Sequence, residues 1–289
     1  IILLVILNKY ILRRPNFSEK NIFLQGKIIA NANERKDDIE TLKDVEFSAF
    51  SQFGEDGIIN FITQNIKIKN KVFLEIGTEN YEEANTRFLL ENNNWSGAII
   101  ESDTDHVQFI KKQSYYWKNN LSVVNSFVTK ENINSLVAQT KLESQISLLS
   151  IDIDGNDYWI WEEIAIKPDI VVIEYNSRFG KDKSVTIPYD KNFQRPSFGK
   201  KRIYFGASLF ALKKLGEKKG YSLIASNSAG NNAFFLKKEH LSEILKEKSV
   251  DDCFVENNFS ETIDKNNNIQ KISIQEQKKF LYSLQLEEV

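Results

Sequence analysis

Short apolar runs alternate with amphipathic stretches over residues 71–174, and this alternation restricts the fold more than any other feature. The apolar runs have the length of buried strands, and the stretches between them show helical spacing of apolar residues. Buried strands that alternate with helices form a mostly parallel sheet, because each crossover helix returns the chain to the same edge. The expected strands are residues 71–76, 97–100, 121–128, 146–153 and 170–174.

Two further apolar runs, residues 221–225 and 233–236, are joined by an Asn- and Ser-rich turn and predict an antiparallel hairpin at the sheet edge. A helix before them ends at Gly220, a predicted C-cap. We therefore predict an α/β fold with a doubly wound, mostly parallel, seven-stranded, Rossmann-like sheet. The other expected helical segments are residues 18–46, 55–66, 82–92, 105–117, 131–141, 158–166, 206–219 and 275–284.

The segments around this sheet suggest three parts. Residues 1–46 are predicted to form a helical N-terminal extension, residues 47–240 the α/β domain, and residues 241–289 a charged C-terminal extension. Residues 177–205 interrupt the strand and helix rhythm as an insertion. The apolar run at residues 1–7 is shorter than the roughly 20 residues that span a bilayer. A helix packed on the domain is the favoured interpretation, with membrane contact through residues 1–14 as the alternative.

The net charge and the cysteine content reduce the number of possible partners and metal sites. The formal net charge of -2 predicts no general attraction to nucleic acid, so no nucleic-acid partner is expected. The single cysteine excludes an internal disulfide and a thiolate zinc site. A cytoplasmic location is predicted, with membrane association through the N-terminus as its alternative.

Acidic residues end most of the predicted strands. In open α/β sheets, ligands bind beyond the carboxyl ends of the strands. One acidic residue there can be a solvated cap, but several at successive strand ends place carboxylates along one edge. This edge is the predicted site, and the residues are Glu75, Glu101, Asp152, Asp154 and Glu174.

The loop after the first strand helps to choose the ligand. It contains a single glycine, Gly77, and three further carboxylates, whereas a dinucleotide site needs several glycines near the pyrophosphate. Such a loop would repel a pyrophosphate. S-adenosylmethionine suits it better because it carries a sulfonium and an ammonium group, and Glu101 can accept hydrogen bonds from both ribose hydroxyls.

Four short motifs together resemble the FkbM-type family of S-adenosylmethionine-dependent methyltransferases, which has the class I methyltransferase fold. They are Phe-Leu-Glu-Ile-Gly at residues 73–77, Ile-Ile-Glu at 99–101, Leu-Ser-Ile-Asp-Ile-Asp-Gly-Asn-Asp at 149–157, and Ser-Gln-Phe-Gly-Glu-Asp at 51–56. The resemblance covers roughly residues 51–236. It implies O-methylation of a hydroxyl group on a sugar, a glycan or another small molecule.

The resemblance also implies roles for single residues. Glu75 and Gly77 would lie against the methionine part of the cofactor, Glu101 would hold the ribose, and Ser126 or Phe127 would lie near the adenine. Asp152 would lie beside the sulfonium, and Asp154 or Asp157 would be the base that faces the acceptor. The loop after Gly77 has fewer small residues than the family pattern. A catalytically inactive binding or scaffold module associated with glycan assembly is therefore the alternative function.

The aspartate cluster at residues 152–157 and the insertion at residues 177–205 can each be interpreted in two ways. Asp152, Asp154 and Asp157 have the chemistry of a magnesium site, but the segment lacks the later glutamate of a calcium loop. No metal is predicted, and a divalent ion remains the alternative to a simple turn. The basic and aromatic insertion favours an anionic or ring-shaped acceptor, or is a solvated loop. Trp159 and Trp161 are expected in the core.

Overall fold

Seven strands form one sheet in the order β3-β2-β1-β4-β5-β8-β7. Strands β1 to β5 pair in parallel, and β8 runs antiparallel between β5 and β7. The predicted doubly wound, mostly parallel, seven-stranded sheet is confirmed, as is the hairpin, whose β7 strand forms the edge. The strands are β1 (Val72–Ile76), β2 (Ser96–Glu101), β3 (Leu121–Asn125), β4 (Leu148–Ile151), β5 (Ile170–Glu174), β7 (Tyr221–Ser226) and β8 (Asn232–Lys237).

The structure is a computed structural model that describes residues 17–36 and 38–289. The N-terminal run, and with it the predicted membrane contact through residues 1–14, lies outside the described residues. Within the described part of the chain, no helix is both long enough and apolar enough to span a membrane.

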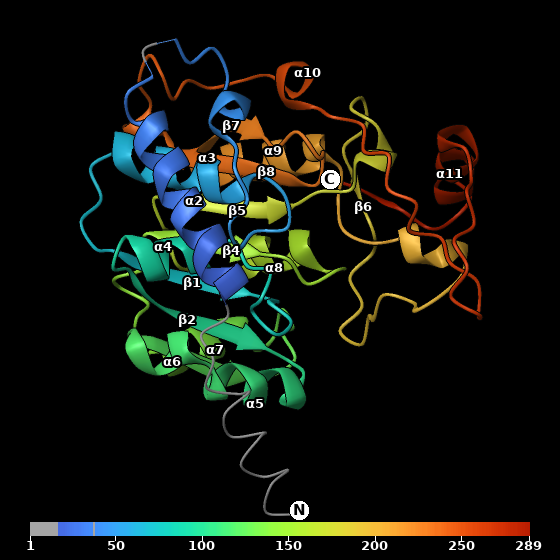
Figure 1. Cartoon of the computed structure of the whole chain (residues 1–289). Coiled ribbons are helices and arrows are strands. Elements are labelled where there is room, and N and C mark those ends of the chain that lie inside the picture. The colour runs from blue at the N-terminus through green and yellow to red at the C-terminus, as the bar shows by residue number, and fades with distance from the viewer. Residues whose placement is uncertain (1–16, 37) are drawn as a thin grey trace, which may run out of the picture.

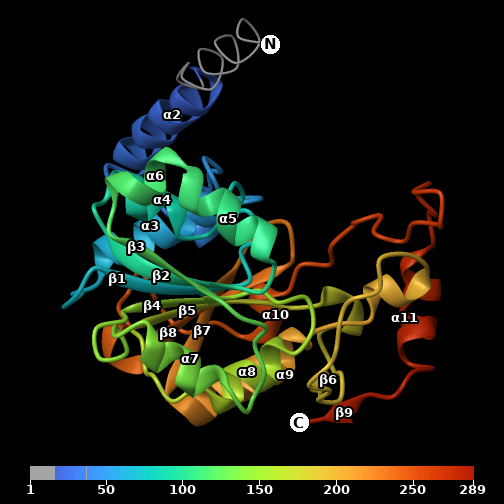
Figure 2. The same cartoon turned by 90° about the horizontal axis from the view of Figure 1, so that it is seen from below.

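Helices cover both faces of the sheet, as Figure 2 shows from below. One layer contains α3 to α6 and the other α7 to α9, and each layer packs on its own apolar cluster. Helix α2 extends outward from the first layer. The helices are α2 (Phe17–Asn33), α3 (Glu55–Asn65), α4 (Arg87–Asn92), α5 (Thr104–Lys112), α6 (Ser114–Lys118), α7 (Ile133–Gln139), α8 (Asp157–Glu163), α9 (Leu209–Lys219), α10 (Val250–Cys253) and α11 (Ile274–Leu281).

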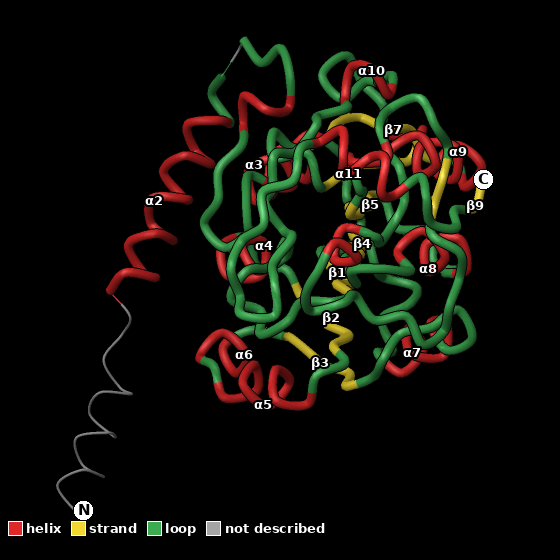
Figure 3. The backbone as a smooth tube through the Cα atoms, turned by 90° about the vertical axis from the view of Figure 1, so that its right-hand side faces the viewer, coloured by secondary structure: helices red, strands yellow, loops and turns green. Residues whose placement is uncertain are grey.

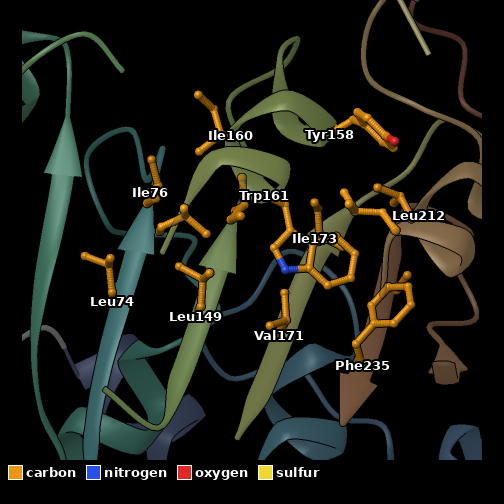
Figure 4. Close-up of a cluster of buried hydrophobic side chains, with 14 of the residues drawn as sticks. Leu74, Ile76, Leu149, Tyr158, Ile160, Trp161, Val171, Ile173, Leu212 and Phe235 are labelled. Atoms are coloured by element: carbon orange, nitrogen blue, oxygen red, sulfur yellow. The ribbon is translucent and has the colours of Figure 1, made fainter. Parts of the chain in front are cut away.

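The larger core lies between the sheet and the α7 to α9 layer. Leu74 and Ile76 point into it from β1 because alternate residues of a strand share a face. Trp161 packs against Phe235 with the rings tilted by 54° and 4.7 Å between their centroids (Figure 4). The indole nitrogen of Trp159 donates to the Ile187 carbonyl oxygen at 2.9 Å. Both tryptophans are therefore core residues, as predicted.

The insertion and the C-terminal segment fold together beyond the carboxyl ends of the parallel strands (Figure 1). Strand β6 (Val185–Thr186) from the insertion pairs antiparallel with β9 (Glu287–Glu288) from the end of the chain. A small apolar cluster joins them, and α11 contributes Leu281 to it. The 3₁₀ helices are η1 (Leu42–Val45), η2 (Ser177–Phe179), η3 (Lys200–Ile203) and η4 (Lys238–His240).

Three helix predictions were wrong in extent. The helix expected at residues 18–46 ends at Asn33. The helix expected at residues 82–92 begins only at Arg87, because the backbone N–H groups of Asn85 and Thr86 donate to the Glu75 carboxylate instead. The helix expected at residues 105–117 breaks at Gln113, which has extended backbone. The predicted C-cap Gly220 is confirmed, with a left-handed φ of 92°.

Candidate active site

A cavity of about 710 Å³ opens at the carboxyl ends of the central strands. Figure 3 looks onto this edge, where loops cover the strand ends. The volume falls in the range of ordinary small-molecule sites. Its lining includes the predicted residues Glu75, Gly77, Glu101, Ser126, Asp152, Asp154 and Glu174. The sequence-based expectation of one acidic edge is thus met by the structure.

Gly77 fixes how closely the first and fourth strand ends approach. Its φ is +76°, and a Cβ atom at this position would lie 1.7 Å from the Asp152 carbonyl oxygen. The chain on both sides is held by sheet-type hydrogen bonds, from Gly77 N to the Ile100 oxygen and from Asp152 N to the Ile76 oxygen, both at 3.0 Å. Only glycine fits at residue 77, because the backbone of residue 152 lies directly against it.

Glu75 holds the loop that follows Gly77. Its carboxylate accepts hydrogen bonds from the backbone N–H groups of Asn85, at 2.8 Å, and Thr86, at 3.1 Å, and from the Thr86 hydroxyl. Burial raises the Glu75 pKa to about 7, and these hydrogen bonds only partly offset that effect. The residue lines the cavity, but its main bonds shape the loop.

Glu101 ends β2 and turns its carboxylate toward the Gly77 loop. One oxygen accepts from Thr78 N at 3.1 Å, and the other accepts from Asp103 N at 2.8 Å. The oxygen that accepts from Asp103 N also accepts from the Ser102 hydroxyl, at 3.4 Å, while the other oxygen can take a second hydrogen bond. Glu101 is buried yet lines the cavity, so its carboxylate is held in place to accept from a ligand donor.

Ser126 and Phe127 follow β3 on the same side of the cavity as Glu101. The Ser126 backbone N–H donates to the Glu101 carbonyl oxygen at 3.0 Å, which ties the two strand ends together. The Phe127 ring is 41% exposed and is available to cover a flat ligand group. This geometry is compatible with the predicted adenine position.

Three carboxylates gather at the ends of β4 and β5. The ligand oxygens of Asp152, Asp154 and Glu174 all lie within 4.8 Å of one another. Burial raises the pKa of Asp152 and of Glu174 well above the ordinary values, and repulsion from the neighbouring carboxylates adds to it. Like charges are thus concentrated where a cationic group of a ligand would be stabilised.

Asp157 does not join this group, although the sequence suggested it as a base or a metal ligand. Its oxygens accept from the backbone N–H groups of Ile153, at 2.8 Å, and Gly155, at 2.9 Å. It is fully buried, and it is absent from the described lining of the cavity. Asp157 therefore shapes the turn before α8, and its position does not fit a base that reaches an acceptor.

The insertion supplies a guanidinium to the acidic edge. Arg195 contacts the Asp154 carboxylate and donates to Glu261 Oε1 at 2.8 Å. Burial opposes its charge, but Asp154 and Glu261 outweigh that effect and raise the Arg195 pKa. Glu261 also pairs with Arg178, so the insertion and the C-terminal segment are joined by an ionic network above the cavity.

Aromatic rings form part of the cavity wall. Phe53 and Phe259 both line the cavity and stack nearly parallel, with centroids 5.1 Å apart. Phe193 from the insertion lies on Gly155, where a Cβ atom would be 2.4 Å from the ring. These rings give an otherwise acidic cavity an apolar wall.

Several lining residues were not predicted as site residues. The motif at residues 51–56 brings Gln52 and Phe53 to the cavity, although its sequence alone does not indicate this position. In the sequence, Arg195 is one of several basic residues of the insertion, and nothing distinguishes it from the others. Phe259 and Glu261 lie in a charged tail with no pattern that could have placed them. Asn232 could have been found, because it opens a strand directly opposite the acidic end of β5.

No family model and no curated protein matches the chain. Solved structures with a similar fold include a candidate caffeoyl-CoA O-methyltransferase from Staphylococcus aureus, with TM-score 0.41, 15% identity and coverage of 81% of this chain and 97% of that one. An O-methyltransferase from Bacillus cereus in complex with SAH has TM-score 0.36, 15% identity and coverage of 80% and 95%. An S-adenosylmethionine-dependent methyltransferase from Clostridium acetobutylicum has TM-score 0.40, 8% identity and coverage of 63% and 90%. At TM-scores this low, we infer function from the residues of the site alone.

Proposed function

We propose that this protein is an S-adenosylmethionine-dependent methyltransferase of the FkbM type that methylates a hydroxyl group of a sugar, a glycan or a small metabolite. The observation that carries the proposal is the pairing of Glu101 with the Gly77 loop. Glu101 accepts from Thr78 N, Asp103 N and the Ser102 hydroxyl, and the oxygen that accepts from Thr78 N can take a further hydrogen bond. A diol such as a ribose suits two adjacent carboxylate oxygens at a buried strand end.

The charge of the site supports a cationic cofactor. Glu174 is buried, Asp152 is half-buried, and both lie close to Asp154, so each carboxylate raises the cost of ionising the next. A sulfonium beside Asp152 would relieve this repulsion. A dinucleotide would add phosphate charge to the same edge and would meet no glycine-rich phosphate loop.

The transfer itself needs alignment more than strong acid or base catalysis. The acceptor oxygen forms a bond to the methyl carbon as the bond from that carbon to sulfur breaks. The electron pair of the broken bond stays on sulfur, which becomes a neutral thioether. Asp154 is the proposed base for the hydroxyl proton, since its side chain is 48% exposed and lines the cavity.

The acceptor side suits a polar ring. Phe53, Phe259 and Phe193 present ring surface, and Arg195 and Arg202 present guanidinium groups to the same cavity. Rings of this kind stack on sugars or aromatic acceptors, and guanidinium groups favour an acceptor that carries an anionic group. The other candidate function, an inactive scaffold module, is favoured by the acidic loop after Gly77.

The test is the melting temperature of the protein with and without S-adenosylhomocysteine. We expect a rise with the native chain, because a ligand that binds only the folded state stabilises it. We expect no rise with Glu101→Ala at the same ligand concentration. Glu82→Ala is the matched control, because Glu82 is an exposed acid of the same loop that does not line the cavity. No rise with the native chain at millimolar ligand would refute the proposal.

A further inference from the structure

We propose that Asp152, Asp154 and Glu174 form a binding site for a divalent cation with hard oxygen chemistry, such as Mg²⁺ or Mn²⁺. The cation site stands on these side chains alone. Its part in holding an acceptor hydroxyl rests on the proposed function.

The spacing of the three carboxylates fits one ion. Their ligand oxygens lie within 4.8 Å of one another. Two oxygens on opposite sides of an ion lie about 4.2 Å apart for Mg²⁺ and about 4.8 Å apart for Ca²⁺, from the usual metal to oxygen distances. A small movement of side chains at the two strand ends therefore brings all three oxygens onto one cation.

Unpartnered buried oxygens in the same cavity point to a missing ligand. Glu174 is 9% exposed, and its Oε2 atom has no hydrogen-bond partner among the described residues. Asn232 is 3% exposed and lies opposite Glu174 in the β5 and β8 register. Its amide nitrogen donates to Glu55 Oε1 at 2.9 Å, while its Oδ1 atom lacks a partner. A buried acceptor left without a donor is costly, so a cation or its bound water accounts for both atoms.

The guanidinium groups near Asp152, Asp154 and Glu174 do not balance the negative charge of these three carboxylates. Arg195 contacts Asp154, but it shares its charge with Glu261. Arg178, the other buried guanidinium nearby, also pairs with Glu261. Arg202 also lines the cavity, but it donates to the carbonyl oxygens of Glu261, at 2.9 Å, and Ser197, at 2.8 Å. Among the described residues, Arg195 is thus the guanidinium that pairs directly with the three clustered carboxylates. A divalent cation would supply two further positive charges and would so offset the remaining repulsion among the three carboxylates.

The proposed ion is held differently from the metal site that the sequence offered as an alternative. Asp157 is committed to the turn before α8, and Glu174 from β5 takes its place. The three residues come from two adjacent strand ends, with the cavity on their open side. Mg²⁺ commonly keeps open positions for water or a substrate oxygen, so the acceptor hydroxyl could complete the coordination.

The test is Mn²⁺ titration of the full chain, freed of metal by a chelator, with the free Mn²⁺ signal followed by electron paramagnetic resonance. We expect one bound Mn²⁺ that Mg²⁺ displaces, and about tenfold or weaker binding in Glu174→Gln, because ligand charge sets the affinity of such sites. Arg195→Gln should bind more tightly, since it removes a competing positive charge. Glu239→Gln is the matched control, because it belongs to the second acidic group, formed with Asp169 and His240.

Asp154→Asn is the second variant, chosen because its side chain is 48% exposed and its loss threatens folding less than that of Glu174. Absence of Mn²⁺ binding to the native chain at millimolar concentration would overturn the proposal. Binding of Mn²⁺ by both Glu174→Gln and Asp154→Asn as tightly as by the native chain would also overturn it. Loss of binding in Glu239→Gln would place the ion at the other group. Melting temperatures with and without S-adenosylhomocysteine, both in excess chelator, separate failure of the cation site from failure of the proposed function. A rise under these conditions would support cofactor binding even if no Mn²⁺ binds.

Discussion

Gly77 and Asp152 meet backbone to backbone, and a Cβ atom on residue 77 would lie 1.7 Å from the Asp152 carbonyl oxygen. This contact joins the end of β1 to the end of β4. It also sets the distance between the residues proposed to face the cofactor and those proposed to face the acceptor. A side chain here cannot be accommodated by rotation, because the obstructing atom is backbone.

Gly77→Ala should therefore destabilise the protein by more than about 2 kcal/mol, because overpacking adds to the left-handed backbone penalty. Gly220→Ala is the matched control. Its φ is also positive, at +92°, but no atom lies within 4 Å of its Cβ position. It should cost only about 1 kcal/mol. Urea denaturation of both variants measures the difference, and equal losses would contradict a steric role for Asp152.

Glu75 should make stability depend on pH. Burial raises its pKa from 4.5 to about 7, so the folded protein keeps a proton that the unfolded chain releases at lower pH. This contribution to the free energy of unfolding is fully present below pH 4.5 and is lost as the pH rises through 7. It amounts to at most about 3 kcal/mol, at about 1.4 kcal/mol per pKa unit.

Urea denaturation from pH 4 to pH 8 tests this dependence. Glu75→Gln cannot titrate, so its stability relative to the native chain should increase across that window. Glu79→Gln, which removes an exposed carboxylate from the same loop, should keep the native pH profile. A Glu75→Gln profile parallel to the native one would show that Glu75 ionises normally in the folded protein.

Trp161 should contribute to stability and not to ligand binding. It is 1% exposed and packs on Phe235, so Trp161→Ala should cost about 3 to 5 kcal/mol. Trp117 is 72% exposed, and Trp117→Ala should change stability by less than about 0.5 kcal/mol. Chemical denaturation followed by circular dichroism compares the two. A small loss for Trp161→Ala would mean that the larger core is not packed as described.

The acidic edge should discriminate between ligands by charge. S-adenosylhomocysteine should raise the melting temperature, whereas NAD⁺ and ADP at the same concentration should not, because Glu75, Glu79 and Glu101 surround a loop without phosphate-binding glycines. Thermal denaturation with each ligand provides the comparison. Stabilisation by ADP alone would favour a nucleotide-binding function.

The central strands could be predicted because each is a short apolar run that ends at a turn or an acidic residue. β1, β2 and β5 lie within one or two residues of the expected positions. The error after β1 has a physical cause. Residues 82–86 have helix-compatible composition, but Glu75 captures the N–H groups of Asn85 and Thr86, and a side chain ten residues away is invisible to local periodicity.

The site was predictable only where it follows strand ends. Glu101 and Asp152 lie there by topology, so their positions follow from the fold. The resemblance implied Asp157 as a possible base and its spacing from Asp154 suggested a metal ligand, whereas its partners in the structure are backbone N–H groups of its own turn. Arg195 and Glu261 reach the cavity through tertiary contacts between an insertion and a charged tail, which no local pattern encodes.

A crystal structure with S-adenosylhomocysteine tests the central claim most directly. We expect the ribose hydroxyls to bind the Glu101 carboxylate, the sulfur to lie beside Asp152, and the adenine to lie near Ser126 and Phe127. A ligand seated outside this cavity, or a ribose directed away from Glu101, would contradict it.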